Sequence, residues 1–437
     1  MFGIKTYIIK GINKRHLLNV NPRSFPTNSI PSHKVKNYIG YIKSISWKKS
    51  EQKNIGWLHT TPHPLAIDAY KTFLESNPNH LGNWTISDSQ EWGTRYLESQ
   101  VIFKMIDLYR GNPKKLEGYV TSGGTEGNLF TAWIGREFLK KFHPCNKICL
   151  IRTSLTHYSI SKAANIISLD QYITPLDSIK WNMHPFGLYL TIKKLYKKGY
   201  RGFILPLTIG YTISGTHDDI QIINNLVKKT ERDFKGVKLF VWIDAALDGL
   251  IEPFINNKFS PFSYPFVQAL IVDYHKFGQV PFPAGIILYK KRLRKLIEQP
   301  IDYLPMSDST LLGSRTGIPA ASIWSVMHVM GRNGYKKEIA SCMKNKHLFM
   351  NGVKSVDPEA KIITDANSLT CGVIFDRIDL SKLSKGVKDK FGLFAKKTSI
   401  RFYPSLTKKL TIFKFYFLPH VKPVSVNSLL GHIKTLI

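Results

Sequence analysis

Short apolar runs alternate with helical patterns between about residue 110 and residue 290, and this alternation constrains the fold more than any other feature. The runs that predict buried strands are residues 117–121, 148–152, 202–207, 238–243, 269–272 and 285–289. Helical patterns lie between several of them, for example at residues 128–142 and 218–230. Strands that alternate with helices favour a mostly parallel sheet with both faces covered. The sequence therefore predicts an α/β fold.

The 437 residues suit one large domain with smaller partners. A loop-like stretch near residues 300–315 is followed by strand patterns at 368–375 and 410–418, which indicates a smaller C-terminal α+β domain. The predicted division is a basic N-terminal extension, an N-terminal helical segment, a large domain and a small domain, at residues 1–50, 51–110, 111–305 and 306–437.

The chain carries 62 Lys and Arg against 30 Asp and Glu, a formal net charge of +32. Such a surplus can indicate a nucleic-acid or membrane partner, or simply a lysine-rich solvated surface. The lysines are dispersed and no nucleic-acid-binding signature is present, so we expect no specific nucleic-acid partner. No stretch of about twenty apolar residues predicts a membrane span.

Residues 1–50 contain ten of the basic residues and no acid. An acid-poor basic segment of this kind can be a loosely ordered tail or an organelle transit peptide. We favour the tail and a cytoplasmic location, with organelle targeting as the alternative.

The four cysteines, Cys145, Cys149, Cys342 and Cys371, form no pair with zinc-ligand spacing. We expect no metal site. Cys145 and Cys149 flank an apolar segment, which predicts that both are buried free thiols.

Three strand ends carry residues suited to chemistry. Ser122-Gly123-Gly124-Thr125 lies between a predicted strand and a helix, where glycines and free N–H groups favour a bound phosphate. Asp244 ends another strand, at the sheet edge where α/β proteins bind ligands, and a protonated ring nitrogen would pair with it. Lys276 follows a third strand, and burial there would suit imine formation. Each feature alone also fits an ordinary turn, cap or surface residue.

A lone histidine, His157, follows the strand at residues 148–152. The order of these elements along the chain, phosphate turn, His, Asp and Lys, resembles that of the group II pyridoxal-5′-phosphate (PLP)-dependent amino-acid decarboxylases, and within them the bacterial histidine and plant serine decarboxylases. The segments that carry the resemblance are residues 118–128, 156–159, 209–219, 244–247, 275–285 and 313–317, with Asn54-Ile55-Gly56-Trp57 similar to an element of the histidine branch. The likeness spans roughly residues 50–437.

The resemblance implies fold type I, with a large domain, a small C-terminal domain and a homodimer whose sites lie at the subunit interface. It implies decarboxylation of an L-amino acid, with histidine and serine as the first candidate substrates. Lys276, His157 and Asp244 would be catalytic, and Tyr303 is a candidate proton donor. The residues that would hold PLP are Lys276, Gly123, Gly124, Thr125, His157, Thr212, Asp244, Ala246 and His275.

Four positions depart from the family pattern. Asp273 replaces the usual Ser or Asn three residues before the lysine, and a carboxylate there would repel a phosphate. Ile318 stands where the family has Gly-His, Tyr211 replaces a small Thr, and Tyr274 replaces Gly. We expect these changes to cluster around the site. They leave open the alternative of a catalytically impaired paralogue that acts as a binding or regulatory protein.

Overall fold

The computed structural model describes residues 29–45, 54–58, 60–83, 92–304, 306–404 and 406–437. The chain forms two units, Met1–Lys53 and Asn54–Ile437. In the first unit, the described residues form helix α1 (Ser32–Ile45). Most of the basic extension, including residues 1–28, lies outside the described residues, so the choice between tail and transit peptide stays a prediction.

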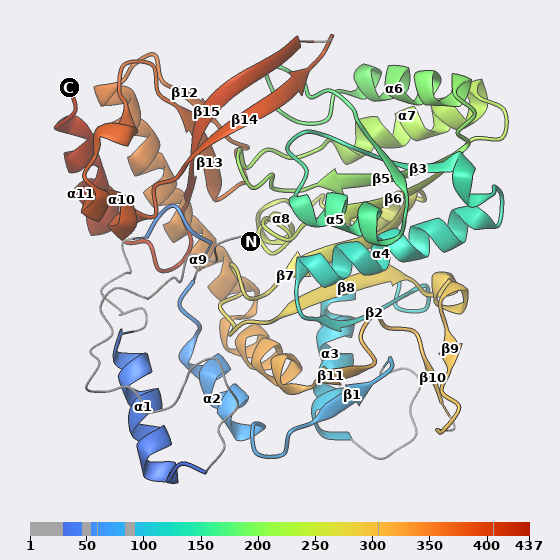
Figure 1. The fold of residues 1–437 in the computed structure, drawn as a ribbon, viewed down its shortest axis with the longest axis horizontal. Coiled ribbons are helices and arrows are strands. Elements are labelled where there is room, and N and C mark those ends of the chain that lie inside the picture. The colour runs from blue at the N-terminus through green and yellow to red at the C-terminus, as the bar shows by residue number, and fades with distance from the viewer. Residues whose placement is uncertain (1–28, 46–53, 59, 84–91, 305, 405) are drawn as a thin grey trace, which may run out of the picture. The chain divides into compact units, whose positions relative to one another are not determined.

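Seven of the described strands of the second unit form one central sheet, in the spatial order β2-β8-β7-β6-β5-β3-β4 (Figure 1). The five strands from β7 to β4 run parallel, and β8 is antiparallel to both of its neighbours. The bounds are β2 (Leu116–Thr121), β3 (Ile148–Arg152), β4 (Asp170–Ile173), β5 (Gly202–Thr208), β6 (Lys238–Asp244), β7 (Val267–Asp273) and β8 (Gly285–Lys290). The predicted α/β class with a mostly parallel sheet is confirmed.

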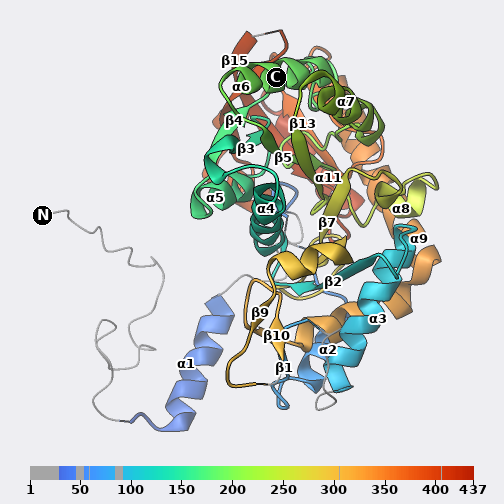
Figure 2. The ribbon, with the colours of Figure 1, turned by 90° about the vertical axis from the view of Figure 1, so that its right-hand side faces the viewer.

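Helices cover both faces of this sheet, which is why β5 and β7 are buried along their whole length. Apolar side chains of α4 (Gly124–Lys140) and α5 (Tyr158–Ile166) pack on one face. The other face is covered by α3 (Trp92–Leu108), α6 (Pro185–Lys197), α7 (Ile220–Asp233) and α9 (Ile318–Val356). Figure 2 shows α4 on one side of the strands and α3 and α9 on the other.

The segment before the sheet contains α2 (Pro64–Thr72) and the short strand β1 (Asn79–Leu81), which pairs with β11 (Ser314–Thr316). Arg315 of β11 donates to Glu98 of α3 at 2.9 Å and to the carbonyl of Val120 in β2 at 2.8 Å. The segment 313–317, which resembles the family, therefore ties α3 and the first strand of the sheet to the start of the C-terminal region.

The C-terminal region begins with α9, which bends at Gly331, where φ is 53° and ψ is −176°. Four of its described strands form an antiparallel sheet in the order β12-β13-β15-β14. Their bounds are β12 (Lys361–Ile363), β13 (Thr370–Ile374), β14 (Ala395–Phe402) and β15 (Leu406–Tyr416), with α10 (Lys385–Phe391) and α11 (Pro423–Lys434) packed beside them. The smaller C-terminal α+β domain is confirmed.

The remaining described elements are short. They are α8 (Glu252–Ile255), β9 (Gln299–Pro300), β10 (Ser307–Asp308) and the 3₁₀ helices η3 (Cys145–Lys147), η4 (Pro261–Ser263), η5 (Lys291–Leu296) and η6 (Leu380–Lys382). Within the described ranges, none of the helices is both long enough and apolar enough to span a membrane.

One side-chain prediction is wrong. Cys145 is exposed, whereas Cys149 is buried. The reason is local: Cys145 begins the 3₁₀ turn η3 before the sheet, and only Cys149 lies within the buried strand β3.

Candidate active site

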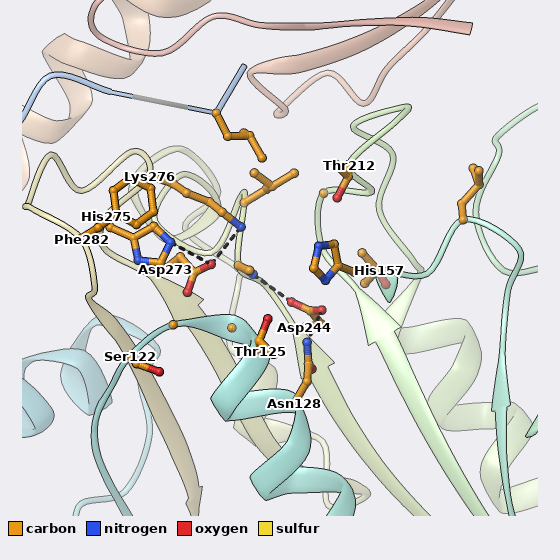
Figure 3. Close-up of a pocket in the computed structure, with 18 residues that line it drawn as sticks. Ser122, Thr125, Asn128, His157, Thr212, Asp244, Asp273, His275, Lys276 and Phe282 are labelled. Atoms are coloured by element: carbon orange, nitrogen blue, oxygen red, sulfur yellow. Dashed lines mark hydrogen bonds and ion pairs between the residues drawn. The ribbon is translucent and has the colours of Figure 1, made fainter. Parts of the chain in front are cut away.

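A cavity of about 330 Å³ opens at the carboxyl edge of the parallel strands (Figure 3). Asp244 ends β6 and Asp273 ends β7, so both carboxylates reach the same edge of the sheet. The residues that line the cavity are Leu58, Ser122, Gly123, Gly124, Thr125, Asn128, Leu155, His157, Thr208, Gly210, Thr212, Asp244, Ala246, Leu247, Asp273, His275, Lys276 and Phe282. All nine residues predicted for the site are among them.

The glycine turn, residues 122–125, connects β2 to α4 along one wall of the cavity. Gly123 has a φ of 133°, a backbone conformation that residues with a Cβ rarely adopt. A Cβ added to Gly123 would stand 2.8 Å from Cε1 of His275. The Ser122 and Gly123 amides already donate to Glu126 and Thr121. The feature of the turn that suits an anion is therefore the N-terminus of the 17-residue helix α4, which begins at Gly124.

Asp244 is buried and held from two sides. Its Oδ2 accepts a hydrogen bond from Nδ2 of Asn128 at 2.9 Å, and its Oδ1 accepts one from the backbone N–H of Ala246 at 3.2 Å. Asn128 is itself fixed, because its Oδ1 accepts from Nε1 of Trp242 at 3.0 Å. The carboxylate therefore has a set orientation at the floor of the cavity.

His157 caps the N-terminus of α5 and faces the cavity. Its Nδ1 lies 2.8 Å from Oγ of Ser159, and that hydroxyl accepts from Asn128 at 2.9 Å. Burial lowers the pKa of His157, although the nearby Asp244 carboxylate opposes this change. The ring is therefore neutral near pH 7 and presents a flat, oriented face.

Lys276 forms an ion pair with Asp273, with 2.9 Å between Nζ and Oδ2. Nε2 of His275 lies 3.6 Å from the same oxygen, while its Nδ1 accepts from the backbone N–H of Ala284. Burial alone would raise the pKa of Asp273, but the Lys276 ammonium and His275 outweigh it and lower that pKa overall. Asp273 is therefore ionised, and its other oxygen, Oδ1, is buried without a hydrogen-bond partner.

The remaining predicted residues line the cavity but form no ion pair in it. Thr125 is exposed in the first turn of α4, and Thr212 and Ala246 are half-buried across the cavity. The carbonyl of Thr212 accepts from the Tyr416 hydroxyl at 2.9 Å, which ties this wall to the C-terminal sheet.

Of the four departures from the family pattern, Asp273 lines the cavity, whereas Tyr211 and Tyr274 lie between lining residues and turn their side chains elsewhere. The Tyr211 hydroxyl donates to Asp218 in the protein interior, and the Tyr274 hydroxyl donates to Sδ of Met105. Ile318 is buried at the start of α9. None of these three side chains lines the cavity in the described part of the chain, and Asp273 alone does so.

Nine of the eighteen lining residues were not in the predicted set, and two of them, Asn128 and Leu58, show why. Asn128 ends the glycine-rich segment, and its place one helical turn after Gly124 was the signal that could have identified it. Leu58 comes from the segment before α2, far from the sheet in the sequence, and no local pattern indicates its approach.

Comparisons with known proteins indicate the family of the chain. The profile of the pyridoxal-dependent decarboxylase conserved domain matches residues 102–376. A tryptophan decarboxylase of Clostridium sporogenes is 31% identical over 276 residues, which are 62% of this chain and 65% of that enzyme. A histidine decarboxylase of Vibrio campbellii is 25% identical over 296 residues, covering 68% of this chain and 73% of that enzyme.

Among solved structures, L-methionine decarboxylase from Streptomyces sp. 590 superimposes with a TM-score of 0.78 at 16% identity. The superposition covers 96% of this chain and 98% of that one. At this identity the likeness concerns the fold.

Proposed function

The chain belongs to the pyridoxal-dependent decarboxylases, and from that premise we propose that it releases the α-carboxylate of an L-amino acid as CO₂ and forms the corresponding amine. One observation carries the proposal: Lys276, Asp244 and the glycine turn line the same cavity. An amine, a carboxylate and an anion site that face one cavity are the three groups that a pyridoxal phosphate requires.

The residues of the cavity fit this cofactor, with one exception. The N-terminus of α4 at the glycine turn would face a phosphate, beside Gly123, where an added Cβ would stand 2.8 Å from Cε1 of His275. Asp244 is the carboxylate for the ring nitrogen, and Lys276 is the amine that would hold the aldehyde carbon. The exception is Asp273, whose negative charge stands beside the phosphate turn.

When bound, PLP supplies an electron-accepting ring that allows the bond between Cα and the carboxylate to break. The protein's own residues orient the cofactor and hold protons. Asp244, fixed by Asn128, would hold a proton at the ring nitrogen without having to reorganise. The neutral His157 ring would stack on the cofactor and keep it in one plane.

A proton must return to Cα after CO₂ leaves. Lys276 and His157 carry exchangeable protons within the cavity. Tyr303 is 82% exposed and is absent from the cavity lining of its own chain in the described residues. A role for Tyr303 as the proton donor would therefore require that it reach the site of a second subunit.

The proposed assembly is a homodimer with the sites at its interface. Phe282 lines the cavity and is 51% exposed, and a second subunit would bury such an apolar group. Sedimentation equilibrium of the purified chain tests this proposal, with twice the monomer mass of 49.9 kDa as the expected result. A monomer at micromolar concentration would contradict it.

For the substrate we propose L-histidine first and L-serine second. The segment 54–57 is similar to an element of histidine decarboxylases, and Leu58 follows it directly into the cavity. Apolar walls at Leu58, Leu155 and Leu247 suit a ring better than a hydroxymethyl group.

A panel of the twenty amino acids, each assayed for CO₂ release with added PLP, tests activity and substrate together. Highest turnover with histidine supports the first choice, and highest turnover with serine supports the second. Turnover with none of the twenty supports the alternative of an impaired paralogue. The observation that favours this alternative is that Lys276 is engaged in an ion pair with Asp273, with 2.9 Å between Nζ and Oδ2.

A further inference from the structure

A second cavity, of about 390 Å³, lies between the segment that connects β4 to α6 and the antiparallel C-terminal sheet. Its lining includes Trp181, Phe402 and Leu410 as apolar walls and two lysines, Lys361 and Lys408. Among the described residues, the two cavities share no lining residue. We propose that this second cavity binds a small aromatic carboxylate. The inference does not depend on the proposed decarboxylation.

Backbone pairing builds the walls of this cavity. The N–H of Leu176 donates to the carbonyl of Arg401 at 2.8 Å, and the N–H of Tyr403 donates to the carbonyl of Leu176 at 2.9 Å. These bonds join the segment before α6 to β14, the strand beside β15 in Figure 1. The rings of Trp181 and Phe402 then meet edge to face, with 5.1 Å between their centroids. The cavity is therefore formed without a ligand.

The charge at the cavity is positive. Nζ of Lys361 lies 5.6 Å from the centroid of the Trp181 ring, and Lys408 reaches the cavity from β15. None of the ion pairs among the described residues includes either lysine. Two ammonium groups without a carboxylate partner favour an anion and repel an amine. An amine product of the active site is therefore a poor occupant.

Trp181 has an unsatisfied polar group. Its side chain is 1% exposed, and its Nε1 has no hydrogen-bond partner among the described residues. The indole N–H of Trp242, by contrast, is equally buried but donates to Asn128 at 3.0 Å. Buried donors of this kind are nearly always paired in natural proteins. A carboxylate oxygen in the cavity would supply the acceptor that Trp181 lacks.

The backbone of Trp181 is also in an uncommon conformation. Its φ is 57°, which is rare for a large side chain and is found mainly where the surrounding structure imposes it. Two hydrogen bonds fix it: its N–H donates to the carbonyl of Asp177 at 3.0 Å, and its carbonyl accepts from Oγ1 of Thr216 at 2.8 Å. The fold thus holds the indole in place as one wall of the cavity.

The walls decide between kinds of anion. An inorganic ion would contact the lysines but leave the aromatic and aliphatic walls unused. A flat ring with a short carboxylate arm uses both, because it packs against Trp181 and Phe402 while its charge reaches Lys361 and Lys408. The volume is within the range of small-molecule sites. An aromatic monocarboxylate therefore fits the cavity better than a phosphate or an amino acid.

The test is a titration of the full-length protein with phenylacetate, followed by tryptophan fluorescence and by calorimetry. Phenylacetamide keeps the shape of this probe without its charge, and acetate keeps the charge without the ring. We expect phenylacetate to bind, and both analogues to bind at least about tenfold more weakly. Equal affinity for phenylacetate and either analogue overturns the inference, and so does the absence of any binding of phenylacetate.

Lysine variants test the charge. Lys361→Gln and Lys408→Gln should each weaken phenylacetate binding by about twofold to fivefold, because both lysines are partly open to solvent. Lys409→Gln is the matched control. Lys409 is the next residue of β15 and is also exposed, but it points to the opposite face of the strand and does not line the cavity. Equal losses in the control and in the other two variants overturn the inference.

Two further variants locate the bound probe. Trp181→Phe keeps an aromatic wall and should abolish the fluorescence response, although the other seven of the eight tryptophans remain. Lys276→Ala should leave phenylacetate binding unchanged, since Lys276 lines only the active-site cavity. A response that persists in Trp181→Phe, or binding that is lost in Lys276→Ala, places the probe elsewhere and overturns the inference. Thermal melting shows which variants fold, and the lysine variants decide if Trp181→Phe does not.

Discussion

Two buried carboxylates of this chain have cationic neighbours but very different surroundings. Glu98 lies behind the sheet, and both of its oxygens are bonded: Oε1 accepts from Arg315 and from the Val120 amide, and Oε2 lies 2.7 Å from Nδ1 of His80. Asp273 lies in the cavity, and only one of its oxygens is paired.

The number of paired oxygens distinguishes a carboxylate with a structural role from one at a ligand site. A carboxylate whose hydrogen bonds are complete gains nothing from a ligand, and its partners join segments that are distant in sequence. A carboxylate at a cavity edge with one unpaired oxygen does not join distant segments in this way, and it lies where a ligand can bind. We therefore expect changes near Glu98 to affect stability and changes near Asp273 and Lys276 to affect cofactor binding.

The largest effect is expected for Lys276→Ala. Among the described residues, Lys276 is the only one whose side-chain amine lines the cavity. Its removal should abolish the visible absorbance of bound PLP and reduce CO₂ release below detection. Lys258→Ala, at an exposed lysine outside the cavity, is the control and should leave both unchanged. Retained absorbance in Lys276→Ala would mean that a different residue holds the cofactor.

Arg315→Ala should lower the free energy of unfolding by about 3–5 kcal/mol, because it leaves Glu98 buried without its cationic partner. The matched control is Arg332→Ala, which breaks the exposed pair with Asp107 and should cost about 0–1 kcal/mol. Urea unfolding of the apo-proteins measures both. Equal losses in the two variants would remove the distinction between the two regions.

The Glu98 cluster also predicts a pH dependence. Burial alone would raise the pKa of Glu98, but Arg315 and His80 outweigh it and lower the pKa to about 2. A depressed carboxyl pKa stabilises the fold above the unfolded value, near 4.5, and this contribution is lost as the pH falls from 4.5 towards 2.

We expect a contribution of about 3 kcal/mol at pH 6 from this group. The difference in unfolding free energy between the wild type and Glu98→Gln should therefore shrink between pH 5 and pH 3. A difference that stays constant over this range would show that the ionised form of Glu98 is not what stabilises the fold.

The smallest effect is expected for Asn128→Ala. It removes one hydrogen bond to Asp244, which should weaken PLP binding by about fivefold to tenfold, or about 1 kcal/mol. Asn224→Ala, on α7 and outside the cavity, is the control and should leave PLP affinity unchanged. PLP affinity of Asn128→Ala equal to that of the wild type would show that Asp244 does not depend on Asn128 for its orientation.

Much of this fold was predictable because each central strand is a short apolar run bounded by turn residues. Strand β3 matches its predicted bounds, residues 148–152, whereas α4 begins at Gly124, four residues before the predicted helix. The prediction started late because the glycines at 124 and 127 have a low helix propensity. The helix nevertheless begins at Gly124, and its N-terminus faces the cavity. Strand β4 was not predicted, since its residues are exposed or half-buried and form no apolar run.

The motifs of the candidate site were predictable from the sequence, but the hydrogen bonds that join them were not. The motif residues meet because β6, β7 and the turn after β2 all end at one edge of the sheet. The bond between Asn128 and Asp244 joins positions 116 residues apart, and the bond between Glu98 and Arg315 joins positions 217 apart. Pairings at such separations leave no local pattern. Nor did the sequence reveal that Tyr211 and Tyr274 point into the interior.

The central claim, that Lys276 holds the cofactor, has one direct measurement. The full-length protein is incubated with PLP, reduced with borohydride, digested and analysed by mass spectrometry. The account predicts a pyridoxyl group on the peptide that contains Lys276, and on no other lysine in stoichiometric amount. A label on another lysine, or no label at all on folded protein, would contradict it.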